Sequence, residues 1–146
     1  MIETTFEKTA YRELLIKAVE ALDYSYSPYS SFAVGAALLD SKGKIWTGAN
    51  IESASYSPTN CGERTALFKA VSEGVREFSA LAVVGRKEGE ETLAQDYAAP
   101  CGVCRQMLME FCSPSMPIIL MKKDGKVQEW TLGELLPFSF TKKNLG

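Results

Sequence analysis

Apolar residues recur near the start of the chain with the period of an amphipathic helix. Between residues 4 and 22 they fall at intervals of three, four, seven and eight positions, and charged residues fill the positions between them. This pattern is typical of a helix that buries one face against the rest of the protein. Thr4 and Glu7 also have the spacing of a capping box, so the pattern predicts a helix over residues 4–22.

Nearly continuous apolar runs then replace the helical period. Residues 32–39 form one such run, and a polar turn joins them to residues 44–51, which predicts an antiparallel hairpin. Shorter apolar runs predict three further strands, over residues 80–85, 117–121 and 127–131. Strands with so little alternation of apolar and polar residues are covered on both faces of the sheet.

Two more helices are expected between these strands. Asn60 has the side chain of an N-cap and precedes a helix over residues 61–73, while Pro100 precedes a helix over residues 101–111. Strand–helix–strand units of this kind imply parallel pairing and right-handed crossovers. We therefore expect an α/β fold, a three-layer α/β/α sandwich around a mixed five-stranded sheet, with residues 1–146 as a single domain.

Composition narrows the classes of function. The formal net charge is −2 and no run of lysine or arginine exceeds two residues, whereas proteins that bind nucleic acid through its backbone carry a basic stripe. The chain has no apolar segment of the roughly 20 residues that span a bilayer, and its N-terminus lacks the features of a signal peptide. We therefore expect a cytoplasmic protein that binds neither nucleic acid nor a membrane and whose thiols stay reduced.

Three cysteines and one carboxylate form the most distinctive pattern in the chain. Cys61 and Cys101 each stand at the start of a predicted helix, where unpaired backbone N–H groups lower a thiol pKa. Cys104 follows one turn after Cys101 and shares its face of the helix. The chain contains no histidine, so a transition-metal site has to be built from thiolates, with carboxylates at most in support. Two helix N-termini that meet at one point would supply three thiolates to a tetrahedral Zn²⁺.

The fourth cysteine is too far along the chain to be a fourth zinc ligand, so such a site would keep one coordination position free. Cys112 lies eight residues after Cys104, which is about 12 Å along a continuous helix. Three protein ligands and one free position are typical of a catalytic zinc site. Glu63 is then placed to take a proton from a water in that position and return it to a leaving nitrogen. The charge of Arg64 would offset the surplus negative charge of three thiolates.

Two other interpretations of these residues stay open. Glu63 stands three residues after Asn60, which is also the spacing of a capping box at the start of a helix. The cysteines could instead belong to a structural zinc module that binds RNA or protein without catalysis. Such a module needs a fourth ligand and usually a basic surface.

Longer stretches of the sequence resemble the short, single-domain cytidine deaminases. The resemblance extends from about residue 11 to residue 140, and its specific parts are residues 29–38, 48–56, 61–66, 70–74, 100–106 and 135–137. It implies zinc-dependent hydrolytic deamination of cytidine and deoxycytidine to uridine and deoxyuridine with release of ammonia, a step of pyrimidine salvage. It also implies one Zn²⁺ per subunit and a homotetramer with shared active sites.

The resemblance assigns catalytic roles residue by residue. Cys61, Cys101 and Cys104 would bind the zinc ion. Glu63 would shuttle protons between water and the base. Arg64 would donate hydrogen bonds to the cysteine sulfurs.

Other residues would hold the nucleoside, again by resemblance. Phe32 would pack on the pyrimidine, and the backbone at Gly62 would contact the base. Asn50 and Glu52 would hydrogen-bond the ribose hydroxyls. The family usually has alanine where Gly62 stands, so the turn there should be more flexible in this chain.

Two aromatic residues are expected to reach another subunit. Tyr56 and Phe140 would help to build the active site of a neighbouring chain in the tetramer. Phe138 lies close enough in sequence to exchange roles with Phe140. The segment 86–99 is longer than the family usually has.

The same chemistry on another substrate is an alternative. A blasticidin-type or polynucleotide deaminase of the same superfamily would use a similar set of zinc-binding and acidic residues. Asn50 and Glu52 favour a free nucleoside, because a polynucleotide has esterified the sugar hydroxyls that these side chains would bind.

Overall fold

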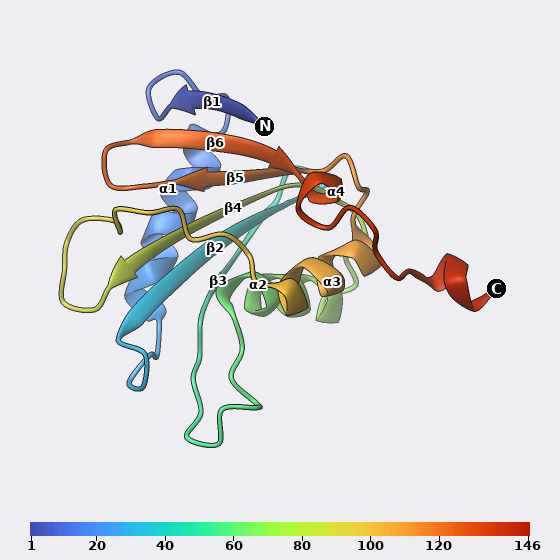
Figure 1. Cartoon of the computed structure of the whole chain (residues 1–146), viewed down its shortest axis with the longest axis horizontal. Coiled ribbons are helices and arrows are strands. Elements are labelled where there is room, and N and C mark those ends of the chain that lie inside the picture. The colour runs from blue at the N-terminus through green and yellow to red at the C-terminus, as the bar shows by residue number, and fades with distance from the viewer.

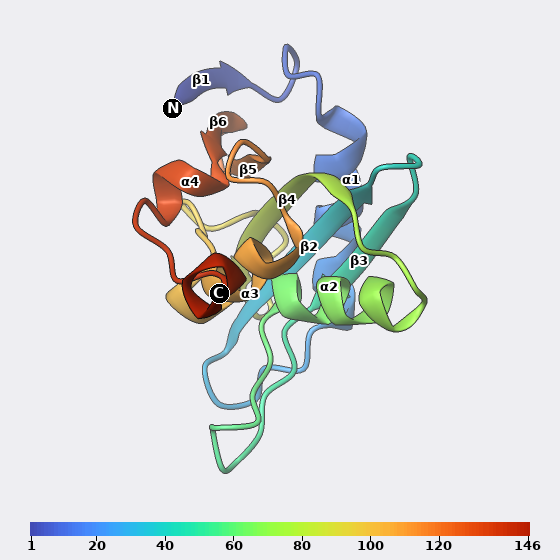
Figure 2. The same cartoon turned by 90° about the vertical axis from the view of Figure 1, so that its right-hand side faces the viewer.

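A computed structural model describes residues 1–146 as one six-stranded sheet with helices on both faces (Figures 1 and 2). The strands are β1 (Ile2–Thr5), β2 (Phe32–Asp40), β3 (Ile45–Ala49), β4 (Phe78–Lys87), β5 (Pro117–Met121) and β6 (Lys126–Thr131). The helices are α1 (Arg12–Ala21), α2 (Gly62–Ser72), α3 (Gly102–Phe111) and α4 (Leu132–Leu135), with 3-10 turns η1 (Leu22–Tyr24) and η2 (Lys142–Leu145). None of these helices combines the length and the hydropathy that a bilayer crossing requires.

The sheet is mixed, as the sequence predicts. Its strand order is β1-β6-β5-β4-β2-β3, and β4 and β5 form the parallel pair, with Leu81 opposite Ile118. All other neighbouring strands are antiparallel. Helix α1 covers one face of the sheet while α2 and α3 cover the other, so the three-layer α/β/α sandwich is confirmed (Figure 2).

The start of the chain differs from the prediction. Residues Ile2–Thr5 form an additional edge strand that pairs antiparallel with β6, with Thr4 opposite Val127. Helix α1 begins only at Arg12 and has no side-chain cap. The predicted helix over residues 4–22 is therefore wrong for residues 4–11, its capping box is wrong, and the sheet has six strands rather than five. The pairing supplies hydrogen-bond partners to β6, which would otherwise present a free edge.

Two apolar cores explain why the strands lack alternation. Leu38 belongs to the core between the sheet and α2 and α3, whereas its neighbour Ala37 belongs to the core under α1. The first core also contains Leu67 and Leu108, and the second contains Leu15, all fully buried. Because β2, β4 and β5 bury both of their faces, successive residues in them are apolar.

Helix α1 approaches the sheet closely at one glycine. A Cβ atom on Gly35 of β2 would lie 2.1 Å from the carbonyl oxygen of Ala18 and 3.2 Å from the Leu22 side chain. Only glycine lets the helix backbone come this near to the strand. The contact fixes the distance between α1 and the sheet, on the face opposite α2 and α3.

Candidate active site

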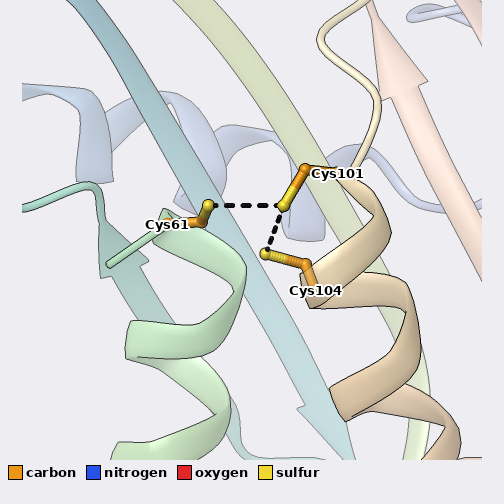
Figure 3. A group of neighbouring side chains, drawn as sticks. All are labelled: Cys61, Cys101 and Cys104. Atoms are coloured by element: carbon orange, nitrogen blue, oxygen red, sulfur yellow. Dashed lines mark hydrogen bonds between the residues drawn. The ribbon is translucent and has the colours of Figure 1, made fainter. Parts of the chain in front are cut away.

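Two helices begin side by side above the sheet, and each begins directly after a cysteine. Cys61 is the N-cap of α2 and Cys101 is the N-cap of α3, both with extended backbone angles. Cys104 lies in the first turn of α3. Figure 3 shows the three sulfur atoms converging in the space between the two helix ends. The unpaired N–H groups and the helix dipoles favour negative charge at this point.

The spacing of the sulfur atoms fits one tetrahedral ion. Cys61 Sγ lies 3.6 Å from Cys101 Sγ, which lies 3.4 Å from Cys104 Sγ, and all three atoms lie within 4.8 Å of one another. Zinc–sulfur bonds of about 2.3 Å place the sulfurs of a tetrahedral site about 3.8 Å apart. Three thiolates at this spacing form a donor set for zinc that leaves a fourth position open.

Cys112 does not belong to this group. It lies at the C-terminal end of α3, it is buried in the core under α2 and α3, and burial raises the pKa of its thiol to about 12. A neutral, buried thiol at this distance along the helix is no ligand for the ion. The residues that could hold zinc are therefore Cys61, Cys101 and Cys104.

Arg64 lies beside the sulfur atoms. Its Nη2 donates to Cys61 Sγ over 3.5 Å, and its Nε is buried without a hydrogen-bond partner. A hydrogen bond from the Cys104 side chain, together with that from Arg64, lowers the pKa of the Cys61 thiol below its usual value. A cation in contact with the cluster stabilises thiolates, which are the form that binds metal.

Glu63 is buried in the first turn of α2 with one carboxylate oxygen unpaired. The residue is 3% exposed, and Oε1 has no hydrogen-bond partner. Burial raises the pKa of this carboxyl to about 7. The capping-box alternative is wrong, because Cys61 is the N-cap and Asn60 instead donates to Thr65 Oγ1 over 3.2 Å. A buried polar atom without a partner is destabilising, so its retention beside three sulfurs fits a site that binds a polar ligand.

Asn50 is hydrogen-bonded to the start of β2, and Glu52 to the loop that precedes it. Asn50 Oδ1 accepts hydrogen bonds from Val34 N and Ser25 Oγ, and its Nδ2 donates to Phe32 O over 2.9 Å. One N–H of this amide is left for another acceptor. The carboxylate of Glu52 accepts three hydrogen bonds, from the backbone N–H of residues 29 and 30 and from the hydroxyl of residue 30. Both side chains thus have defined orientations.

Phe32 borders a hollow at the start of β2. A Cβ atom on Gly85 would lie 2.6 Å from Phe32 Cζ, so the phenyl ring rests directly on the glycine of the neighbouring strand. The hollow has a volume of about 500 Å³ and is otherwise lined mainly by residues 90–97. A larger hollow of about 560 Å³ lies against α1 and contains none of the predicted site residues.

Tyr56 and Phe140 are exposed on the surface. Their exposed fractions are 71% and 58%, and Phe138 is fully exposed. Tyr56 stands in the loop between β3 and α2, which extends beyond the end of the sheet in Figures 1 and 2, and its ring packs edge-to-face with that of Tyr29. Phe140 is tied to α3, since Gln106 Nε2 donates to its carbonyl oxygen over 2.7 Å.

Two supporting residues were not found by sequence reasoning. Arg105 donates from Nε to Pro100 O over 2.7 Å and from Nη1 to Leu135 O over 2.8 Å, and thus fixes the turn that leads into Cys101. Ser25 orients the amide of Asn50. The arginine that directly follows Cys104 was a visible signal, whereas nothing in the sequence relates Ser25 to a strand that follows much later.

Fold and site together define an α/β zinc protein in which thiolates from two helix N-termini face a buried carboxylate. The family described as "Cytidine and deoxycytidylate deaminase zinc-binding region" matches residues 8–120. The chain belongs to this family, and the resemblance stated from its motifs is confirmed.

Individual relatives extend over nearly the whole chain. A cytidine deaminase of Sporosarcina psychrophila is 50% identical over 133 residues, which cover 91% of this chain and 93% of the relative. The crystal structure of cytidine deaminase from Burkholderia pseudomallei is 42% identical, covers 90% of this chain and 100% of that one, and superposes with a TM-score of 0.80. A blasticidin-S deaminase of Bacillus cereus is 28% identical over 131 residues, with coverage of 89% and 91%.

Replacement of Cys104 by alanine is expected to abolish tight zinc binding. Residues outside the ligand set alone change metal affinity by about 10–100-fold, so the loss of a ligand is expected to exceed about 100-fold. Metal content by elemental analysis and zinc affinity by chelator competition measure the effect. Cys112→Ala is the matched control, since it also removes a buried thiol of α3 but should retain one zinc per chain. Full zinc content in Cys104→Ala would contradict the three-thiolate site.

Proposed function

We propose that this protein hydrolyses cytidine and deoxycytidine to uridine and deoxyuridine and releases ammonia. The observation that carries the proposal is the buried carboxyl of Glu63, with Oε1 unpaired, which interacts with Cys61 and Cys104 of the three-sulfur cluster. This is the arrangement that a zinc-dependent attack of water on an amidine carbon requires. The match to the deaminase family over residues 8–120 supports the same reaction.

The protein residues account for the proton transfers. When bound by Cys61, Cys101 and Cys104, zinc supplies a Lewis acid that makes water acidic near neutral pH. Glu63 accepts a proton from the attacking water and passes it to N3 of cytosine as the oxygen bonds to C4. Glu63 then carries the remaining hydroxyl proton to the amino nitrogen, which leaves as ammonia while the C4 carbonyl forms. A carboxyl with a pKa near 7 is suited to both directions of transfer.

Arg64 has an electrostatic task in this scheme. Three thiolates and one divalent cation have a net charge of −1, and this surplus negative charge would weaken the Lewis acidity of the cation. The guanidinium that donates to Cys61 Sγ withdraws part of that charge from the sulfur. This hydrogen bond supports a role for Arg64 in maintaining the Lewis acidity of a zinc ion bound by the three cysteines.

The nucleoside is proposed to lie between Phe32 and the cysteine cluster. Phe32 would pack on the pyrimidine ring, and the backbone at Gly62 would contact the base. The free N–H of Asn50 would donate to a ribose hydroxyl and the carboxylate of Glu52 would accept from one. These contacts need sugar hydroxyls that are not esterified, so we propose a free nucleoside and no nucleic acid as the substrate.

The oligomer is also a proposal. Exposed Tyr56 and Phe140 support the homotetramer with shared active sites that the sequence motifs imply, since free aromatic rings are common at protein interfaces. A single domain and a cytoplasmic location stay predictions of the sequence.

Replacement of Glu63 by glutamine is expected to lower the turnover of cytidine by about 10²–10⁴-fold, because the amide can neither take up nor return a proton. Zinc content should stay at the wild-type level, since Glu63 is no ligand. Loss of cytidine absorbance measures turnover. Glu73→Gln, an exposed change in the residue that ends the same helix, is the control. Near-normal turnover in Glu63→Gln would exclude the proposed role.

A substrate comparison separates the proposal from its alternatives. Cytidine and deoxycytidine should be deaminated, whereas blasticidin S and a short single-stranded oligonucleotide should react at least about 100-fold more slowly, since both lack a nucleoside with free ribose hydroxyls at the expected place. Ultraviolet absorbance follows all four compounds. Faster reaction of blasticidin S or of the oligonucleotide would identify the other deaminase classes. No reaction of any compound, with zinc bound, would favour a structural zinc module.

Sedimentation equilibrium is expected to give four times the 16.0 kDa mass of one chain. In the tetramer Phe140→Ala should lower turnover more than Phe138→Ala does, because Phe140 is the residue proposed to reach a neighbouring site. A monomer at the concentration of the activity assay, with full activity, would refute the shared active sites.

A further inference from the structure

Strand β3 meets helix α2 at a glycine that leaves no room for any side chain. A Cβ atom on Gly48 would lie 2.4 Å from the backbone nitrogen of Ala66 and 2.4 Å from the carbonyl oxygen of Gly62. These two atoms belong to the first turns of α2, directly around Glu63 and Arg64. The obstacle is backbone on the helix side, so a larger residue at position 48 cannot be accommodated by a change of rotamer.

Gly62 forms the helix side of this contact. A Cβ atom there would lie 3.2 Å from the carbonyl oxygen of Gly48 and 3.0 Å from that of Val34. We call the pair the Gly48–Gly62 contact. It brings the start of α2 against β3 and β2, and an added methyl group demands a large shift at Gly48 and only a small one at Gly62.

The site is divided between this helix and its neighbour. Cys61 and Glu63 move with α2, whereas Cys101 and Cys104 belong to α3 and do not take part in the Gly48–Gly62 contact. The 3.6 Å between Cys61 Sγ and Cys101 Sγ therefore joins two helices of which only α2 makes the Gly48–Gly62 contact. Any change in the height of α2 above β3 alters this distance.

We propose that Gly48 is a positioning residue for the deamination. It sets the height of the first turn of α2 above the sheet, and through that turn it places Cys61 and Glu63 relative to the two sulfurs of α3. The inference rests on the proposed function for its catalytic consequence. Relief of a 2.4 Å contact to ordinary van der Waals distance moves the turn by about 1 Å, and a misplacement of this size lowers the rate by about 100-fold.

Gly48→Ala tests the proposal, with Gly35→Ala as the matched control. Both substitutions add one methyl group against a helix backbone, at α2 in one case and at α1 on the opposite face in the other. Both should lower the urea midpoint of unfolding. Only Gly48→Ala should change the thiolate-to-metal absorption of the cobalt-substituted protein, weaken zinc by about tenfold or more, and lower kcat by about 100-fold with a smaller change in KM.

Gly62→Ala provides the same test with less strain. It needs only a small shift of the same turn, so it should fold even where Gly48→Ala does not, and it should change the cobalt absorption in the same direction by a smaller amount. If Gly48→Ala and Gly35→Ala changed zinc affinity equally, Gly48 would contribute only to stability and the proposal would be wrong. The proposal would also be overturned if each of Gly48→Ala and Gly62→Ala that folds had the cobalt spectrum of the wild-type protein.

The two claims fail separately. A wild-type protein that binds cobalt through thiolates but does not deaminate cytidine would refute the proposed function, while the spectra and zinc affinities would still decide whether Gly48 positions Cys61. A wild-type protein that deaminates cytidine, with Gly48→Ala equal to wild type in all three measurements, would refute only the inference.

Discussion

The convergence of two helix N-termini on one point is the constraint on which the site depends. Helices α2 and α3 each begin with the residue after a cysteine, and their first turns present unpaired N–H groups to the same space. Three thiolates repel one another, and partial positive charge from both helix ends together with Arg64 opposes this repulsion. The sheet below holds the helix ends together, because the two helices share one apolar core on one face.

The polar groups that the fold leaves unsatisfied lie beside this convergence. Glu63 Oε1 and Arg64 Nε are buried side-chain atoms without a hydrogen-bond partner, and both residues stand in the first turn of α2. Each such atom destabilises the folded chain by about 1–3 kcal/mol when nothing binds it. Zinc and substrate bind the folded protein and thereby offset this loss. The buried polar atoms that lack a hydrogen-bond partner thus lie at the active site and not in the apolar cores.

Local sequence patterns predicted the helices and strands that support the site, but they missed the edge strand β1 and misplaced the N-cap of α2. The apolar run of β2 predicted a strand that is buried on both faces. The cysteines before α2 and α3 predicted where these helices begin, because an N-cap position leaves a local signal in the sequence. Strand β1 was missed because Ile2–Thr5 is too short to show alternation and is held by pairing with β6, a contact distant in sequence. The predicted cap at Asn60 was wrong because its side chain turns to Thr65. Equally, neither the burial of Glu63 nor the close approach at Gly48 can be recognised without the packing of helix on sheet.

Removal of the metal tests the central claim most directly. The protein should be treated with a zinc chelator, separated from it and assayed for conversion of cytidine to uridine before and after zinc is added back. Turnover should disappear with the metal and return as one zinc per chain is restored. Undiminished turnover in protein that elemental analysis shows to be free of metal would contradict it.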